Sequence, residues 1–78
     1  MADRYARLVR CFSAVFPEID EHAIPTASVD SAPEWDSLAS LTLVAVVEEE
    51  FGITIDDLDL VELHSFDAFD EYVRERAA

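Results

Sequence analysis

The most apolar helical stretch of the chain, residues 38–51, carries both a start signal and a stop signal for a helix. Asp36 precedes it, and an aspartate carboxylate can accept hydrogen bonds from the free N–H groups of a first helical turn. Gly52, the only glycine in the sequence, follows it at the position where a left-handed residue commonly ends a helix. We therefore expect a helix from residue 36 to about residue 51, with Ser37 at its first helical position.

Two apolar stripes run along this expected helix. The first has the spacing of a side that faces a core, and it consists of Leu43, Val46, Val47 and Phe51. The second begins beside Ser37 and consists of Leu38, Leu41, Val44 and Ala45. Two interpretations of the second stripe remain open. The helix is central and buried all round, or the stripe borders a cleft or docking surface next to Ser37.

Apolar residues at helical spacing predict an earlier helix over about residues 3–16, with Asp3 as its N-cap. The periodicity then stops, and prolines within residues 17–35 indicate a long loop. A loop of this length is unusual in a compact domain, so we expect apolar side chains to anchor it to the core. The expected anchors are Ile19, Ile24 and Val29.

The C-terminal part predicts two further helices. A short one covers about residues 56–62 and a last one about residues 65–76, capped by Ser65. The inward side of the last helix consists of Phe66, Phe69 and Val73. With 78 residues the chain has room for one domain, 1–78, and its expected fold class is all-α.

Charge restricts the possible partners. The chain has 18 acidic residues against five basic ones and a net charge of -13, which disfavours binding to nucleic acid or to an anionic membrane. Basic protein surfaces are the natural partners. Glu48, Glu49 and Glu50 form an acidic run where the helix dipole disfavours negative charge, so the run is either solvated surface or a binding element. Without a signal segment or a membrane-spanning run, we expect a cytoplasmic protein. We also expect a monomer.

The residues that most often carry catalysis or bind metals lack the necessary context. Cys11, His22 and His64 do not have the spacing of a zinc site. The aspartates of residues 56–59 lack the glycine and the glutamate of a calcium loop. No Gly-x-Ser-x-Gly elbow surrounds Ser37 and no histidine is marked as its base. We therefore expect no metal and no catalytic residue, with Ser37 a substrate for another enzyme.

Four features in order resemble the acyl carrier proteins, including the related peptidyl carriers, over nearly the whole chain. They are an amphipathic first helix, a long loop, Asp36-Ser37-Leu38 at the start of a helix, and Glu48-Glu49-Glu50-Phe51-Gly52-Ile53 at its end. The closing Ser65-Phe66-x-x-Phe69-x-x-Tyr72-Val73 is similar to the family's last helix. The resemblance implies a small four-helix bundle with three long helices and a short third helix.

The resemblance also implies a cofactor and partners. A phosphopantetheinyl transferase would transfer 4'-phosphopantetheine from coenzyme A to Ser37, which Asp36 and Leu38 flank. The arm would hold acyl or aminoacyl groups as thioesters for loading ligases, synthases or transferases with basic docking surfaces. These enzymes would belong to fatty acid, polyketide or related specialised biosynthesis. The implied partner and cargo contacts are Trp35, Leu41, Val44, Ala45, Glu48 and Glu49.

The motif departs from the family's common Gly-x-Asp-Ser-Leu pattern, because Glu34 replaces the glycine and Trp35 precedes the aspartate. The Trp-Asp-Ser-Leu form resembles free-standing carriers of specialised pathways. Two other functions remain open. One is an acidic helical interaction module in which Ser37 stays unmodified, and the other is a small hydrolase that uses Ser37 or Cys11.

Overall fold

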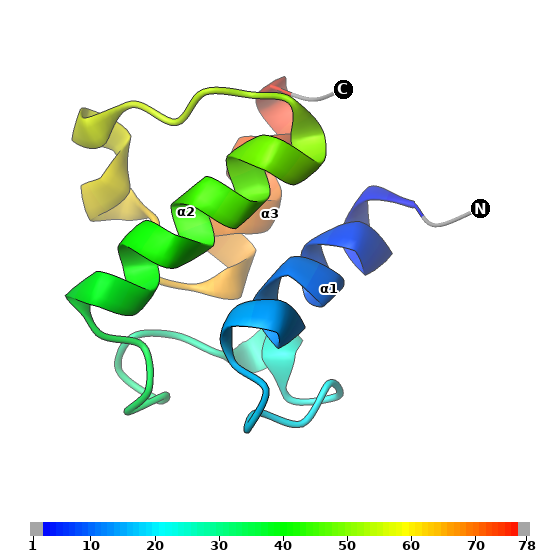
Figure 1. Cartoon of the computed structure of the whole chain (residues 1–78), viewed down its shortest axis with the longest axis vertical. Helices are drawn as coiled ribbons and strands as arrows, with labels where there is room; N and C mark the ends of the chain where they lie inside the picture. The colour runs from blue at the N-terminus through cyan, green and yellow to red at the C-terminus, as the bar shows by residue number, and fades with distance from the viewer. Residues whose placement is uncertain (1–2, 77–78) are drawn as a thin grey trace.

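Helices make up the regular structure of the chain. The computed structural model describes residues 3–76, and within them no β-strand forms. The elements in order are α1 (Arg4–Val15), the 3₁₀ helix η1 (Ile24–Thr26), α2 (Ser37–Phe51), the 3₁₀ helix η2 (Asp57–Glu62) and α3 (Phe66–Arg76). In Figure 1, α1 and α2 lie in front and α3 lies behind them. The expected all-α class is confirmed, and the expected short third helix is η2.

Capping residues set the ends of the long helices. Asp3, Asp36 and Ser65 each accept a hydrogen bond from the backbone N–H three residues later, at 2.8, 2.8 and 3.1 Å. Each bond satisfies one of the N–H groups that a helix start leaves without an intrahelical partner. Gly52 follows α2 with a φ of 65°, a left-handed conformation that glycine adopts without a Cβ clash.

Aromatic side chains fill the centre of the bundle. Phe12 of α1 contacts four other rings at centroid distances of 5.0–6.3 Å, and three of these contacts are edge-on. Its partners are Phe16, Trp35, Phe66 and Phe69. Aliphatic side chains from every long helix surround these rings with no exposed surface, namely Leu8, Leu43, Val47 and Val73. The core therefore joins α1, α2 and α3 with the loop that precedes α2.

The loop between α1 and α2 is held by backbone hydrogen bonds as well as by burial. The N–H of Val29 donates to the carbonyl of His64 at 2.9 Å, and the N–H of Phe66 donates to the carbonyl of Ala27 at 3.0 Å. Ile24 is fully buried, as expected of an anchor, and Ile19 is half-buried. The expectation for Val29 is wrong, because its side chain is exposed.

Phe51 at the end of α2 lies at the edge of the core. It is half-buried and packs against the core, as expected of the stripe that faces the core. The Arg7 guanidinium lies 4.7 Å from the centre of its ring, and Arg7 also binds the carboxylate and the carbonyl of Glu50, both at 2.7 Å. Arg7 of α1 thus covers the C-terminal end of α2, where a positive charge is favourable.

None of the helices in residues 3–76 is long and apolar enough to cross a membrane.

Candidate functional site

Ser37 is the first residue of α2, and its side chain is exposed. Asp36 uses its carboxylate for the Ala39 N–H and its carbonyl for the Ser40 N–H, at 2.8 and 2.9 Å. Within the described residues no side chain accepts a hydrogen bond from the Ser37 hydroxyl. The hydroxyl is therefore open to solvent at the positive end of the helix dipole.

A second Asp-Ser pair, Asp30-Ser31, provides an internal comparison. Ser31 lies in the loop rather than at the start of a helix, and its hydroxyl contacts the backbone N–H and the hydroxyl of Ser28 at 3.0 and 3.2 Å. These bonds commit its oxygen to the turn. Of the two Asp-Ser serines, Ser37 alone combines a helix start with an uncommitted hydroxyl.

Trp35, expected to contact a partner or cargo, lies in the core. Its side chain is only 4% exposed and packs against the rings of Phe12, Phe16 and Phe69. Its indole N–H donates to Ser40 Oγ at 2.8 Å. Three core rings, distant in sequence, thus provide an apolar site for the indole, and a contact of Trp35 with a partner or cargo stays a prediction.

The second apolar stripe of α2 divides into an exposed and a half-buried part. Leu38 and Leu41 are 73% and 57% exposed, and Ala45 is exposed as well. Val44 is half-buried and packs against the core, so only part of it is available to a partner. A helix buried all round is excluded, and an apolar surface extends from Ser37 along α2.

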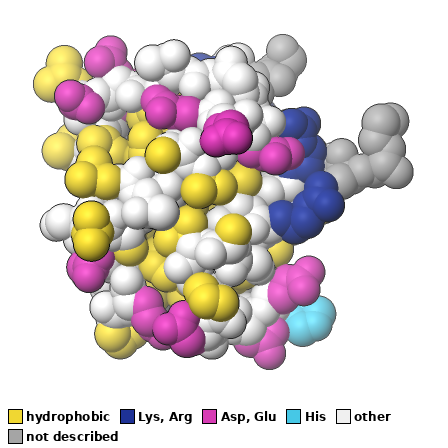
Figure 2. All heavy atoms as spheres, in the orientation of Figure 1, with side chains coloured by type: hydrophobic (Ala, Val, Ile, Leu, Met, Phe, Trp, Pro, Cys, Tyr) yellow, Lys and Arg dark blue, Asp and Glu magenta, His cyan; other side chains and the backbone are white. Residues whose placement is uncertain are grey.

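The contribution of η2 to this surface was not predicted from the sequence. Leu58 and Val61 are 82% and 79% exposed, the largest exposures among the large hydrophobic side chains of residues 3–76. Figure 2 shows hydrophobic side chains on the side of the molecule where α2 begins and η2 lies. The available signal was that Leu58 and Val61 lie next to acidic residues along the chain, because a segment that must keep those charges in water lies at the surface. We call Leu38, Leu41, Leu58 and Val61 the apolar patch.

The acidic run at the end of α2 consists of three carboxylates with three different surroundings. Glu48 accepts the backbone N–H of Ile55 at 2.7 Å, and Glu50 binds Arg7. Glu49 is exposed and forms no ion pair within residues 3–76. The carboxylate of Glu48 holds the turn after α2, and its partner contact stays a prediction. The same holds for Glu49, which follows Ala45 by one helical turn on the same side of α2.

Cys11 is buried in the core rather than presented to a substrate. Its side chain is 4% exposed, and burial, reinforced by the charge of Glu50, raises its pKa from 9.0 to about 11. No group of three or more His, Cys, Asp or Glu residues arranged to hold a metal ion is present in residues 3–76.

Cys11 should therefore react slowly with alkylating reagents. Because the thiolate is the nucleophile, iodoacetamide at pH 8 should modify the folded protein about a hundredfold more slowly than the protein in urea. The neutral thiol is favoured in the folded state, so this contribution to stability is present below pH 9 and is lost as the pH rises through about 11. Mass spectrometry of quenched samples gives the alkylation rates of the folded protein and of the protein in urea. Equal rates would show that the thiol is accessible.

Comparison with known proteins agrees with the geometry around Ser37. The family model described as phosphopantetheine attachment site matches residues 6–73. No curated protein and no solved structure matches the chain. The matched region contains all of α2 and most of α1 and α3. The chain therefore belongs to the phosphopantetheine attachment site family, a family of carrier domains that bind 4'-phosphopantetheine covalently.

Proposed function

We propose that this protein is an acyl carrier protein whose Ser37 carries 4'-phosphopantetheine. The arm holds acyl or aminoacyl groups as thioesters and delivers them to enzymes of fatty acid, polyketide or related specialised biosynthesis. The chain itself contributes no catalytic residue and is the substrate of a phosphopantetheinyl transferase. The observation that carries the proposal is the exposed, uncommitted Ser37 hydroxyl at the start of α2, inside the matched region.

The residues around Ser37 fit the phosphate end of the arm. The first turn of α2 offers backbone N–H groups and the positive end of the helix dipole, which stabilises an exposed anion by about 0.3–1 kcal/mol. Leu38 and Leu41 provide apolar surface beside it. When bound, the group supplies a terminal thiol on a flexible chain, and this thiol holds the cargo.

The charge distribution supports docking of partner enzymes on the α2 and η2 side. No Lys or Arg occurs between residues 11 and 73, so α2 and η2 carry acidic charge only. In Figure 2 the arginines gather on the other side of the view, near the start of α1. A partner whose apolar contact area is surrounded by Lys and Arg would match the apolar patch and its acidic surroundings.

The direct test is incubation with coenzyme A, Mg²⁺ and a promiscuous phosphopantetheinyl transferase. Intact-mass spectrometry should show the gain of one phosphopantetheinyl group per chain. If several transferases leave the native protein unmodified, the apolar patch would instead indicate an acidic interaction module with an unmodified Ser37.

Glu49 provides a test of electrostatic recognition. Glu49→Lys should lower the transferase kcat/KM by about threefold to tenfold at low ionic strength, because complementary charge speeds encounter. The difference should shrink as salt is added. Steady-state kinetics with carrier as the varied substrate measure both effects.

The matched control is Glu18→Lys, which makes the same charge change at an exposed position in the loop after α1, outside α2 and η2. It should leave kcat/KM within about twofold of the native value, because exposed charges away from the docking side are screened. Equal losses for both variants would show that net charge, and not a docking surface on α2, controls recognition.

A further inference from the structure

The short helix η2 is held in an unusual way. None of its residues is buried. Of its three large apolar side chains, Leu58 and Val61 are exposed and Leu60 is half-buried. Buried residues lie only on either side of it, at Ile55 and Leu63. Full burial therefore fixes only the two ends of this segment, and the helix between them contributes no more than the half-buried Leu60.

One polar cluster links η2 to the rest of the fold. The Tyr72 hydroxyl donates to Asp59 Oδ2 at 2.8 Å, and an Arg76 guanidinium nitrogen lies 3.6 Å from the same oxygen. The Arg76 guanidinium also lies 4.0 Å from the centre of the Tyr72 ring. Within residues 3–76 no other side-chain hydrogen bond or ion pair joins η2 to a helix.

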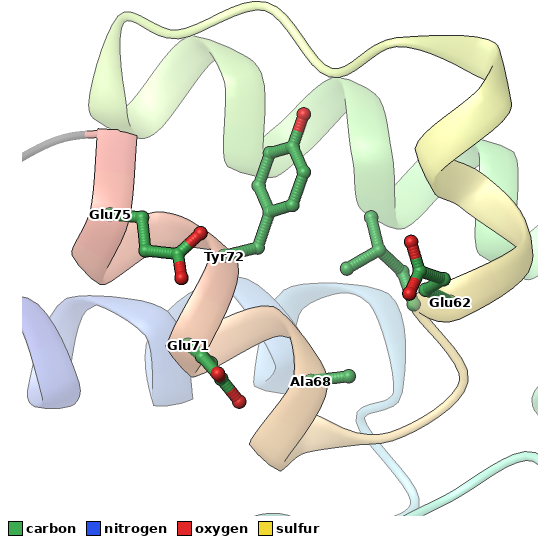
Figure 3. A pocket seen from close by; sticks show the side chains of 6 residues that line it. Glu62, Ala68, Glu71, Tyr72 and Glu75 are labelled. Carbon is green, nitrogen blue, oxygen red and sulfur yellow. The ribbon is translucent and has the colours of Figure 1, made fainter.

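The groove beside this cluster separates η2 from α3. Its volume is about 320 Å³, and it is lined by Glu62, Leu63, Ala68, Glu71, Tyr72 and Glu75. In Figure 3 the Tyr72 side chain projects from α3, and Glu62 lies across the groove on the η2 side. Carboxylates on both sides of the groove repel each other, so the contact between Tyr72, Asp59 and Arg76 opposes a charge repulsion that would move η2 outward.

The chemistry of the cluster suits a reversible contact. Burial and the hydrogen bond to Asp59 raise the pKa of Tyr72 above its ordinary value, so the hydroxyl stays protonated as a donor. Arg76 supplies the positive charge that compensates Asp59. A single hydrogen bond to a charged acceptor and one partly exposed ion pair contribute modestly, so the contact can open without unfolding the core.

We propose that Asp59, Tyr72 and Arg76 form a latch that holds η2 against α3 and thereby sets the position of Leu58 and Val61 for a docking enzyme. This inference rests on the proposed function, because it assigns the apolar patch to partner binding. Tyr72 and Arg76 are positioning residues, since they act through η2. Partner affinity is then controlled from α3, a helix that lies outside the apolar patch.

The first measurement is hydrogen exchange of the native-state amides with millisecond labelling. Tyr72→Phe keeps the ring under Arg76 but removes the donor, and exchange in residues 57–62 should rise about tenfold. Exchange in α1 and α2 should stay unchanged. The control is Tyr5→Phe, because Tyr5 packs on Phe66 and forms no hydroxyl hydrogen bond within the described residues. Unchanged exchange in η2 of Tyr72→Phe would overturn the latch.

The second measurement separates docking from general stability. Arg76→Gln should raise the KM of phosphopantetheinyl transfer severalfold and leave kcat unchanged, since Ser37 lies on a different element. Arg74→Gln is the control, because Arg74 makes the same type of ion pair within α3, 2.9 Å from Asp70, and does not touch η2. It should leave KM at the native value.

The outcomes distinguish this inference from the proposed function. If the native protein is not modified, the proposed function and the docking role fail together, while hydrogen exchange still shows whether the latch holds η2. If η2 exchange rises but KM does not change, the latch exists and its control of docking is overturned. A fall in kcat equal in both arginine variants would also overturn it.

Discussion

Ser37→Ala should abolish phosphopantetheinylation completely. The substitution removes the Ser37 hydroxyl, which is exposed at the start of α2 and forms no side-chain hydrogen bond within the described residues. Asp36 remains as the N-cap and alanine is a good helix former, so α2 should keep its structure. Intact-mass spectrometry after incubation with coenzyme A and transferase measures the loss, and far-UV circular dichroism checks the fold.

Ser31→Ala is the matched control for this loss. It removes the hydroxyl of the other Asp-Ser pair, which bonds to Ser28 in the loop. This variant should still gain one phosphopantetheinyl group. If Ser37→Ala is still modified, the attachment site is not Ser37. If neither variant is modified, the loss cannot be assigned to the Ser37 hydroxyl.

Trp35→Ala should have the largest effect on stability of any substitution next to the attachment site. It removes a buried side chain that contacts three core rings, and such truncations cost about 3–5 kcal/mol. Whole domains have about 5–15 kcal/mol of stability, so the variant should melt far below the native protein. Urea unfolding followed by far-UV circular dichroism measures the difference.

One further variant separates packing from hydrogen bonding at this position, and a second serves as an exposed control. Trp35→Phe keeps an aromatic ring but loses the N–H that donates to Ser40, so its loss should be smaller than that of Trp35→Ala. Leu58→Ala shortens a side chain that is 82% exposed and should change stability by less than about 0.5 kcal/mol. An unchanged unfolding midpoint for Trp35→Ala would remove the indole from the core.

The parts of the fold that depend on neighbouring residues could be predicted from the sequence. Asp3, Asp36 and Ser65 cap helices through bonds that span three residues, and Gly52 ends α2 through its own backbone conformation. These are local interactions, so the residue types and their spacing contain the information. The α-helices consequently begin and end close to their expected positions.

The surroundings of individual side chains could not be predicted in the same way. Trp35 is buried because α1 and α3 bring aromatic rings to it, and Glu48 turns inward because the chain returns to present the Ile55 N–H. Both outcomes depend on residues distant along the chain or on the path of a loop. The same limit applies to the docking surface, where the exposed Leu58 and Val61 lie on η2.

The candidate attachment site is less dependent on such distant contacts. Ser37 is exposed because it occupies the first position of a helix whose start is set by Asp36. Its surroundings on α2, Leu38 and Leu41, also follow from helical spacing. What periodicity leaves open is which of two apolar stripes faces the core, since either side of α2 could be buried.

The backbone bridge between Ser28 and Ser65 has a consequence for how the chain folds. It closes residues 29–64 into one loop, and α2 and η2 both lie inside that loop. Contacts between such distant residues form late, because loop closure costs entropy before packing compensates for it. The joining of α2 and η2 on one surface therefore depends on this long-range contact, whereas the Asp36 cap that exposes Ser37 is local and can form earlier.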